Sequence, residues 1–327
     1  MLNIIHIFGV STKITFAMFE SLSAIDEIRL NFSPGGLLFM NITLAFIMFG
    51  VALGIKVDHF KNIFTKPKSA ILGIISQIIL LPALTFGLVI LINPPPSIAM
   101  GMILIAACPG GNISNFISSL AKANTALSVG LTAFATLTAS LFTPLNFAIW
   151  GGLYVKYFEK AHELNIPIEL SFYQMAKTVF ILLGIPLVAG MWFAYKFPVT
   201  TEKIRKTVKI SSIVAYMIFI IGALYANLEY IPLVIIPLTA ITLILNSQTL
   251  FTGFIVGTIA RVSKADRRTL SIETGIQNSG LALVLIFNPL LFDGIGGMAF
   301  IAAWWGILQM ITGIGIAGIL AKIKIPN

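Results

Sequence analysis

The chain has 327 residues, of which 57% are hydrophobic and only 10% are charged, and its mean hydropathy is +0.98. Soluble domains average roughly 45–50% apolar and about 25% charged residues, so this composition excludes a soluble domain and predicts an integral membrane protein. The single cysteine, Cys108, excludes an internal disulfide, and the net charge of +9 would suggest a nucleic-acid partner only in a soluble protein.

The N-terminal segment, residues 1–34, does not have the form of a removable signal peptide, because no basic segment precedes a clean apolar one. Residues 4–30 instead mix Ile and Phe with charged side chains such as Lys13, Glu20 and Arg29. Hydropathy favours an interfacial amphipathic helix, and a tenth, weakly apolar span is the alternative.

Apolar runs of about 20 residues recur along the rest of the chain, which favours a polytopic bundle of α-helices over a barrel of short strands. The fold class predicted is therefore an all-α polytopic membrane protein. Nine spans are predicted, at about 36–56, 69–92, 97–121, 125–151, 172–195, 208–227, 231–260, 265–292 and 296–320.

Basic residues are concentrated in alternate loops, as at Lys203, Arg205 and Lys206, whereas the loop 93–96 has none. By the positive-inside rule, the basic loops and the tail 321–327 are cytoplasmic, and 152–171 is an extracellular or periplasmic connection. This placement explains the high charge without nucleic acid. It predicts a multi-pass protein of the inner (plasma) membrane in contact with the lipid bilayer.

Two predicted spans contain polar, helix-breaking sequence, CPGGNISN from Cys108 to Asn115 and ETGIQNSG from Glu273 to Gly280. The second of these helices is expected to begin at Ser263, which forms a capping-box pattern with Asp266. Freed backbone groups cost several kcal/mol each in hydrocarbon, so they are tolerable only where another broken helix, water or an ion meets them. The residues expected to open the helices are Pro109, Gly110, Gly111, Gly275 and Gly280.

The two interruptions occupy corresponding places in two halves of the chain. Residues 172–320 hold five predicted spans with the interruption in the fourth, and 35–151 hold four with the interruption in the third. If the N-terminal segment supplies a first element, the halves are five-helix repeats of inverted topology. Paired interrupted segments in such repeats point to the binding site of a secondary transporter.

Glu273 is the only acidic residue well inside a predicted span, and intramembrane carboxylates are costly enough to indicate function. The alternative is that it lies near the cytoplasmic end and either extends to the membrane surface or pairs with Arg267 or Arg268. A carboxylate with hydroxyls, amides and freed carbonyls forms an all-oxygen set that suits a hard cation such as sodium. The three histidines are scattered, so sodium is the only metal expected, and no cofactor is expected.

Other polar residues inside spans have two interpretations. Gln77, Asn246 and Gln248 are each as compatible with bonding between helices as with binding a ligand. The series Ser128, Thr132 and Thr136 lies on one helix face, where hydroxyls commonly bond to carbonyls one turn earlier.

Motifs of metalloproteases, serine hydrolases, P-loop enzymes and dinucleotide-binding enzymes are absent from the sequence, so an enzyme is not predicted. Without a nucleotide site, transport would be driven by an ion gradient or would be passive.

ACPGGNISNFISSLAKANTALSVGLTAFATLTASLFTP (Ala107 to Pro144) and IETGIQNSGLALVL (Ile272 to Leu285) together resemble the bile acid:sodium symporter family, especially its bacterial members. The resemblance extends from Phe46 through the last span. It implies nine to ten transmembrane helices in two inverted five-helix repeats. A panel domain would pack against a core domain in which two discontinuous helices cross.

The resemblance also implies two sodium ions behind the crossing. The first would be bound by Ser114, Asn115, Ser128, Thr132 and Glu273. The second would be bound by the side chains of Gln77, Glu273 and Gln277 and by the carbonyls of Thr274 and Ile276.

On the substrate side, the resemblance points to Asn112 and Asn278 facing the last span. Bacterial relatives tend to have a His-Asn pair there, where this chain has Gln309 and Met310. This departure argues against bile-acid specificity. Because half-helix N-termini direct positive dipoles at the crossing, a small organic anion is expected.

The sequence therefore predicts a monomeric sodium-coupled symporter that takes up an organic anion, bile-acid-like or a smaller carboxylate, by alternating access. A proton-coupled or sodium-independent exporter of similar fold, with Glu273 as a proton relay, is the main alternative. A sensor or scaffold without transport is a third.

Overall fold

The computed structural model describes residues 26, 30, 34–55, 67–158, 172–225, 229 and 231–323. The regular secondary structure of this part is helical, with one isolated β-bridge between Gly110 and Gln277. The predicted amphipathic or tenth spanning helix at 1–34 lies outside the described residues except for Asp26, Leu30 and Pro34.

The helices follow one another as α2 (Pro34–Ala52), α4 (Pro67–Ile75), η1 (Ser76–Leu80), α5 (Leu81–Ile92), α6 (Pro96–Ala107), α7 (Ile113–Leu120), α8 (Thr125–Tyr157), α9 (Phe172–Val179), η3 (Phe180–Gly184), α10 (Ile185–Lys196), α11 (Pro198–Tyr225), α12 (Ile231–Ile259), α13 (Lys264–Gly275), α14 (Ser279–Phe287) and α15 (Gly296–Lys322). The segments η1 and η3 are π-helical and continue directly into α5 and α10.

Six helical segments of the described part are long and apolar enough to cross a membrane: Gly35–Ala52, Pro67–Ile92, Thr125–Tyr157, Phe172–Lys196, Val234–Ile259 and Gly296–Lys322. Large apolar side chains such as Leu91, Ile236 and Ile259 are exposed on the outside of the bundle, as a lipid-facing surface requires. The protein is a multi-pass membrane protein. The number of nine to ten transmembrane helices stays a prediction.

Each predicted span coincides with one helix or with consecutive helical segments, but several boundaries differ. α14 ends at Phe287 instead of 292, because the chain leaves the helix at Asn288. α8 continues to Tyr157 instead of ending at 151, because the Gly151–Gly152 pair does not interrupt the helix. α11 begins at Pro198 instead of 208, because its first turns carry charged side chains that hydropathy assigns to a loop.

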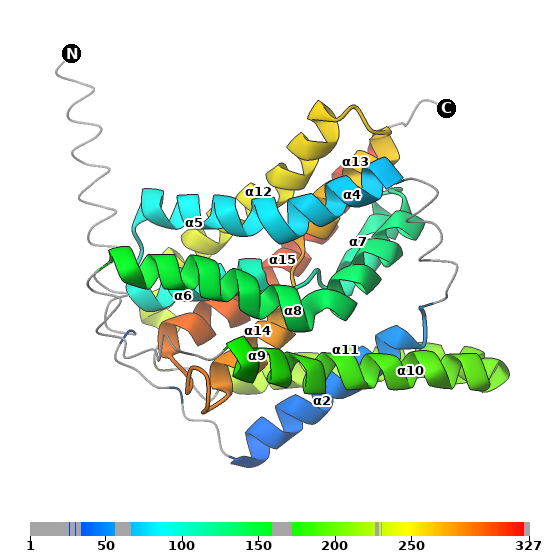
Figure 1. Cartoon of the computed structure of the whole chain (residues 1–327), viewed down its shortest axis with the longest axis horizontal. Helices are drawn as coiled ribbons and strands as arrows, with labels where there is room; N and C mark the ends of the chain where they lie inside the picture. The colour runs from blue at the N-terminus through cyan, green and yellow to red at the C-terminus, as the bar shows by residue number, and fades with distance from the viewer. Residues whose placement is uncertain are drawn as a thin grey trace.

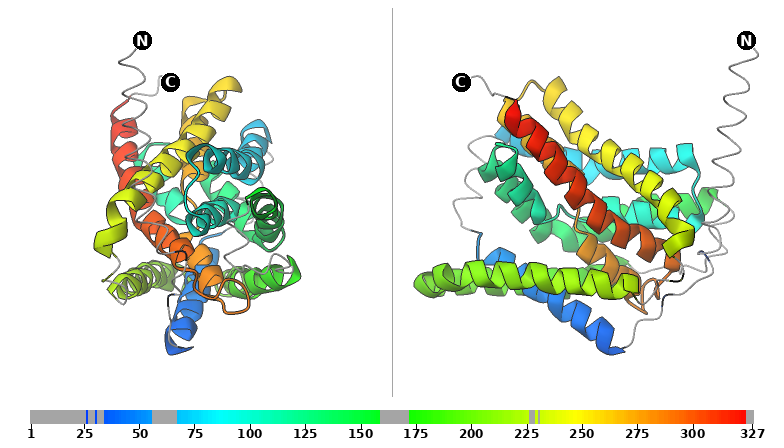
Figure 2. Two further views of the ribbon diagram at one scale, coloured as in Figure 1. Left: turned by 90° about the vertical axis from the view of Figure 1, so that its left-hand side faces the viewer. Right: turned by 180° about the vertical axis from the view of Figure 1, so that it is seen from behind.

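Three groups of helices, α2, α9–η3–α10 and α11, lie along one side of the molecule (Figures 1 and 2). α2 and α10 approach closely, because a Cβ added at Gly190 would lie 2.6 Å from Cβ of Ala52, and Phe49 meets Phe193 edge to face. The remaining helices surround the two interrupted ones. Division into a panel domain and a core domain stays a prediction.

The interruptions at 108–112 and 276–278 cross each other; we call this region the crossing. The amide of Gly111 donates to the carbonyl of Ile276 over 2.8 Å, and the amide of Asn278 donates to the carbonyl of Pro109 over 2.9 Å. Each unwound segment thus supplies hydrogen-bond partners to the other. The expectation that another broken helix meets the freed backbone groups is confirmed.

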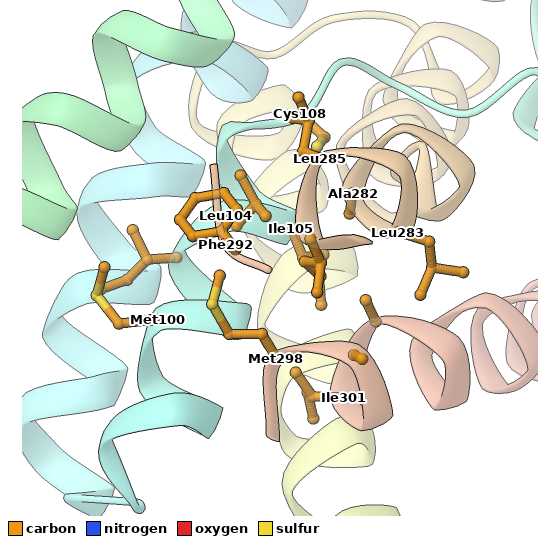
Figure 3. Close-up of a cluster of buried hydrophobic side chains, with 14 of the residues drawn as sticks. Met100, Leu104, Ile105, Cys108, Ala282, Leu283, Leu285, Phe292, Met298 and Ile301 are labelled. Atoms are coloured by element: carbon orange, nitrogen blue, oxygen red, sulfur yellow. The ribbon is translucent and has the colours of Figure 1, made fainter. Parts of the chain in front are cut away.

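The crossing separates an apolar half of the two interrupted helices from a polar half. α6 and α14 are buried throughout from Ser97 to Ala107 and from Ser279 to Phe287. Figure 3 shows their apolar side chains together with those of the chain that follows, including Met100, Leu104, Ile105, Ala282, Leu283, Leu285, Phe292, Met298 and Ile301. The other halves, α7 and α13, contain the hydroxyl, amide and carboxyl groups of the candidate site.

Candidate functional site

Glu273 lies near the C-terminal end of α13 and is only 1% exposed. The helix begins after Ser263, whose hydroxyl accepts a hydrogen bond from the amide of Asp266 over 3.1 Å, so the predicted start is confirmed. The helix ends at Gly275, where the crossing begins. Glu273 is therefore held in the last turn before the unwound backbone.

Three hydroxyl groups surround the Glu273 carboxylate. Ser114 of α7 donates to Oε1 over 2.6 Å, and Thr132 of α8 donates to Oε2 over 2.9 Å. Ser128 of α8 also donates to Oε1. Each hydroxyl gives its hydrogen to the carboxylate, so its oxygen lone pairs remain available to a cation.

Asn115 completes this first cluster from the adjacent position of α7. Its side-chain oxygen lies 2.9 Å from the hydroxyl of Ser128 and 3.4 Å from that of Thr132, as an alternative acceptor for the same two hydrogens. The structure thus brings together all five residues that the resemblance implied for a first sodium site. The oxygens come from α7 and α8, which follow one another in the chain, and from α13, which is distant from both in sequence.

The interpretation that Glu273 pairs with a neighbouring arginine is wrong. Arg268 donates to the carbonyls of Ala121 and Ile323 over 2.9 and 2.7 Å, and Arg267 lies over the ring of Phe254. Among the described residues, the carboxylate of Glu273 has hydroxyl partners and no ion pair.

A second cluster lies against the main chain of the same turn. Gln77 of η1 donates from Nε2 to the carbonyl of Glu273 over 2.7 Å, and Gln277 donates from Nε2 to the carbonyl of Thr274 over 2.8 Å. Oε1 of Gln277 is buried without a partner in the described part. The carbonyl of Ile276, a further implied ligand, accepts from Gly111 within the crossing.

Gly110 lies between the two clusters. A Cβ added there would be 2.4 Å from Nε2 of Gln77 and 3.4 Å from Oε2 of Glu273. A side chain at this position would displace the Gln77 amide, so the absence of one allows the unwound backbone to approach both groups.

On the other face of the crossing, Asn278 caps α14 by accepting from the amide of Leu281 over 3.0 Å. Its Nδ2 and the Oδ1 of Asn112 are buried without partners in the described part. Gln309 of α15 accepts from the amide of Gln277 over 2.9 Å and donates to its carbonyl over 3.0 Å. Gln309 therefore lies next to the crossing and also stabilises its backbone through these two hydrogen bonds.

The two glycines expected to open the second helix do not lie in its unwound segment. Gly280 is the second residue of α14, so the prediction that it lies in the break is wrong; the Asn278 cap restarts the helix before it. Gly275 ends α13, and a Cβ there would lie 2.3 Å from Leu250 of α12, so this glycine permits close helix packing. Pro109, Gly110 and Gly111 all lie between α6 and α7.

Sequence reasoning missed Ser76, whose hydroxyl is 2.8 Å from Oγ1 of Thr274 in the buried region beside Gln77. Its position next to Gln77 could have indicated a role in the same cluster. In a regular helix, however, adjacent side chains point about 100° apart, which argues against a shared cluster. Thr136, in contrast, donates to the carbonyl of Thr132 over 2.7 Å, as the back-bonding interpretation expected. Asn246 donates to the carbonyl of Gly275 over 3.2 Å and thus links α12 to the second break.

Interrupted helices that cross at a buried polar centre are typical of secondary transporters. The chain belongs to the Sodium Bile acid symporter family, which matches it over residues 41–233. The resemblance seen in the two polar motifs is thereby confirmed.

Relatives in bacteria, plants and animals support the same family. YocS of Bacillus subtilis, named an uncharacterized sodium-dependent transporter, is 30% identical over 77% of this chain and 75% of its own length. BASS1 of Arabidopsis thaliana, named a probable sodium/metabolite cotransporter, is 28% identical over 75% of this chain and 58% of its own. The P3 protein of Homo sapiens is 26% identical over 86% of this chain, which spans 58% of that protein.

Proposed function

We propose that this protein is a sodium-coupled symporter that takes up an organic anion by alternating access. One observation carries the proposal: the Glu273 carboxylate is 1% exposed inside an apolar bundle, and its described partners are neutral hydroxyls. A buried carboxylate needs a compensating positive charge or a proton. A cation bound by the same oxygens supplies that charge.

The first cluster supports sodium at one site. Ser114, Ser128, Thr132 and Asn115 contribute neutral oxygens around one carboxylate, the donor chemistry that hard cations prefer. Sodium here is cargo and coupling ion. Its arrival would turn hydroxyl and amide oxygens that now bond to each other toward the ion.

The second cluster supports a further sodium ion that shares Glu273. Oε1 of Gln277 is a buried acceptor without a described partner, and such groups call for an explanation such as a ligand. The side-chain amides of Gln77 and Gln277 donate to the successive carbonyls of Glu273 and Thr274, so both lie against the same turn. One carboxylate between two monovalent cations reduces their mutual repulsion, so sodium binding is expected to be cooperative.

A small organic anion, a carboxylate smaller than a bile acid, is the proposed substrate. Asn112 Oδ1 and Asn278 Nδ2 offer unpartnered polar atoms, and no side-chain cap bond covers the N-terminus of α7. Helix N-termini favour negative charge. The resemblance implies a His-Asn pair where this chain has Gln309 and Met310, which argues against bile acids.

The proposal extends to a monomer in the inner (plasma) membrane with a cytoplasmic C-terminus and no enzymatic activity. The basic loops support this orientation through the positive-inside rule. The names of YocS and BASS1, a sodium-dependent transporter and a sodium/metabolite cotransporter, support transport coupled to sodium.

Thermal unfolding of the purified protein in sodium or choline chloride tests the ion site. Sodium is expected to stabilise the wild type, and Glu273→Gln is expected to abolish that stabilisation. Asp293→Asn, which makes the same change at an exposed carboxylate, should leave the response intact. A Glu273→Gln variant with the wild-type sodium response would overturn the assignment.

Uptake into proteoliposomes separates this function from its main alternative. A panel of small carboxylates is presented with an inward sodium gradient, and sodium is then replaced by choline while a pH gradient is imposed. Uptake that requires sodium supports the symporter. Uptake or efflux that follows the pH gradient in choline contradicts it and favours a proton-coupled carrier.

A further inference from the structure

The helix that supplies Gln77 is interrupted by a rare local geometry. Between α4 and α5, the five residues Ser76–Leu80 form the π turn η1, in which the amide of Leu81 donates to the carbonyl of Ser76, five residues earlier. Well under about 1% of residues in soluble proteins are π-helical, and such turns occur often at functional sites. Gln77 is the second residue of this turn.

The π turn corrects a rotation that the sequence would otherwise impose. One row of buried residues in this segment recurs at every fourth position, and a regular helix would rotate that row by about 40° per step, or about 200° over five steps. One additional residue in a π turn removes about 100° of this drift. The row is Ser69, Gly73, Gln77, Leu81, Thr85 and Val89.

The two ends of the row contact different helices. Ser69 donates to Oδ2 of Asp266 in α13 over 3.0 Å, and Thr85 donates to Gln248 of α12 over 3.3 Å. Gln77 lies between them and reaches the carbonyl of Glu273. Without the π turn, α4 and α5 could not both keep these contacts while Gln77 faces α13.

Pro82 removes the bond that a regular helix would need here. Because proline has no amide hydrogen, the carbonyl of Ile78 cannot receive its usual donor from position 82. The second π turn, η3 (Phe180–Gly184), has the same pattern, with a bond from Ile185 to Phe180 and with Pro186 at the same offset. The pattern occurs twice in the part of the chain that the structure describes.

Proline alone does not produce the turn, because Pro144 and Pro237 lie inside α8 and α12, which have no π segment. In η1 a second contribution comes from Ser76, whose hydroxyl is 2.8 Å from Oγ1 of Thr274. Ser76 and Gln77 thus bond to two successive residues of α13, Thr274 and Glu273.

We propose that Pro82 and Ser76 are positioning residues of the second sodium site. They hold the π turn that directs the Gln77 amide at the last turn of α13. This inference rests on the proposed function, because it assigns a role within the sodium site proposed there. Neither residue contacts the ion; both act through the orientation of Gln77.

Pro82→Ala tests the inference through the sodium concentration that gives half-maximal thermal stabilisation. The alanine amide can restore a regular helix and rotate Gln77 away, so the half-maximal concentration should rise about fivefold to tenfold, the equivalent of one ligand contact. In choline the melting temperature should stay equal or increase, because a backbone bond is gained. A merely structural proline predicts the opposite, a lower melting temperature in both salts at an unchanged half-maximal concentration, and that result would overturn the inference.

Pro186→Ala is the matched control, because it makes the same change beside η3, a helix segment that contributes no residue to the site. Its half-maximal sodium concentration should equal that of the wild type. An equal shift in both proline variants would show a general effect on folding and would also overturn the inference.

Ser76→Ala gives an independent measurement should Pro82→Ala fail to fold. It removes the bond to Thr274 and should raise the half-maximal sodium concentration severalfold; an unchanged value overturns the inference. A wild type without any sodium response overturns the proposed function and this inference together. A wild type whose response is lost in Glu273→Gln, with wild-type values in Pro82→Ala and Ser76→Ala, overturns this inference alone.

Discussion

The main-chain amide of Gly111 donates to the carbonyl of Ile276 over 2.8 Å, and this bond joins helix interruptions from the two halves of the chain. The approach is close enough to exclude a side chain. A Cβ added at Gly111 would lie 2.8 Å from the carbonyl oxygen of Gln277 and 3.1 Å from its carbon. Backbone atoms cannot move aside as a flexible side chain can, so the crossing depends on this glycine.

Gly111→Ala is therefore expected to destabilise the protein by about 1–3 kcal/mol, as overpacking commonly does, and to weaken sodium stabilisation strongly. Thermal unfolding in sodium and in choline measures both effects. Gly152→Ala is the control, because a Cβ there would meet nothing within 4 Å. Equal behaviour of the two variants would contradict the role given to the crossing.

Thr132→Val and Thr136→Val form a matched pair one turn apart on α8. Thr132 donates to Glu273, whereas Thr136 donates to the carbonyl of Thr132. Loss of the Thr132 hydroxyl removes a proposed ligand and should raise the half-maximal sodium concentration about tenfold. Thr136→Val should leave that concentration within about twofold of the wild type. A larger effect at Thr136 than at Thr132 would count against the first site.

Gln309 braces Gln277 through two hydrogen bonds, and its replacement separates two roles. If the main role of Gln309 is to hold the backbone of Gln277, Gln309→Leu releases that backbone. The half-maximal sodium concentration then rises severalfold even without substrate. A purely substrate-binding role would raise only the KM for the anion in proteoliposome uptake. We expect the sodium effect. Met310→Leu, a conservative change beside it, should alter neither quantity.

Arg268 joins three segments near the start of α13, because its guanidinium donates to the carbonyls of Ala121 and Ile323. Arg268→Ala should lower the free energy of unfolding by about 3 kcal/mol, since it leaves two carbonyls without their charged donor. The loss should be equal in sodium and choline, because Arg268 does not contact Glu273. Arg261→Ala, at an exposed arginine, should cost less than about 0.5 kcal/mol. A selective loss of the sodium response in Arg268→Ala would contradict this structural role.

Local chemistry explains which features the sequence could predict. The helix start at Ser263 and the opening at Pro109, Gly110 and Gly111 depend on residues next to one another in the chain. Such signals can be read without knowledge of the fold. The place of Gly280 is also set locally, because the Asn278 cap restarts the helix before it; the prediction gave the glycine more weight than the cap.

Features that depend on contacts between distant segments remained open. Ser128, Thr132 and Thr136 look alike in sequence, and only the position of α13 makes the first two partners of Glu273. The π turn at Ser76 escaped prediction because hydropathy is the same on every face of an apolar helix. In the sequence, the sign of this turn was the four-residue spacing of small and polar residues before Pro82.

The apolar packing of α6 against α14 has an electrical consequence (Figure 3). Hydrocarbon polarises weakly, so a membrane voltage is expected to fall more across this apolar half than across the half that contains the polar groups. In the proposed orientation, with the basic loops in the cytoplasm, this apolar half separates Glu273 from the outside, and moving one charge across the whole membrane is worth about 2.3 kcal/mol for every 100 mV. Two sodium ions carried with one monovalent anion would move one net positive charge inward per cycle. The negative interior of the cell would then drive uptake directly, as a measurable current, in addition to the sodium concentration gradient.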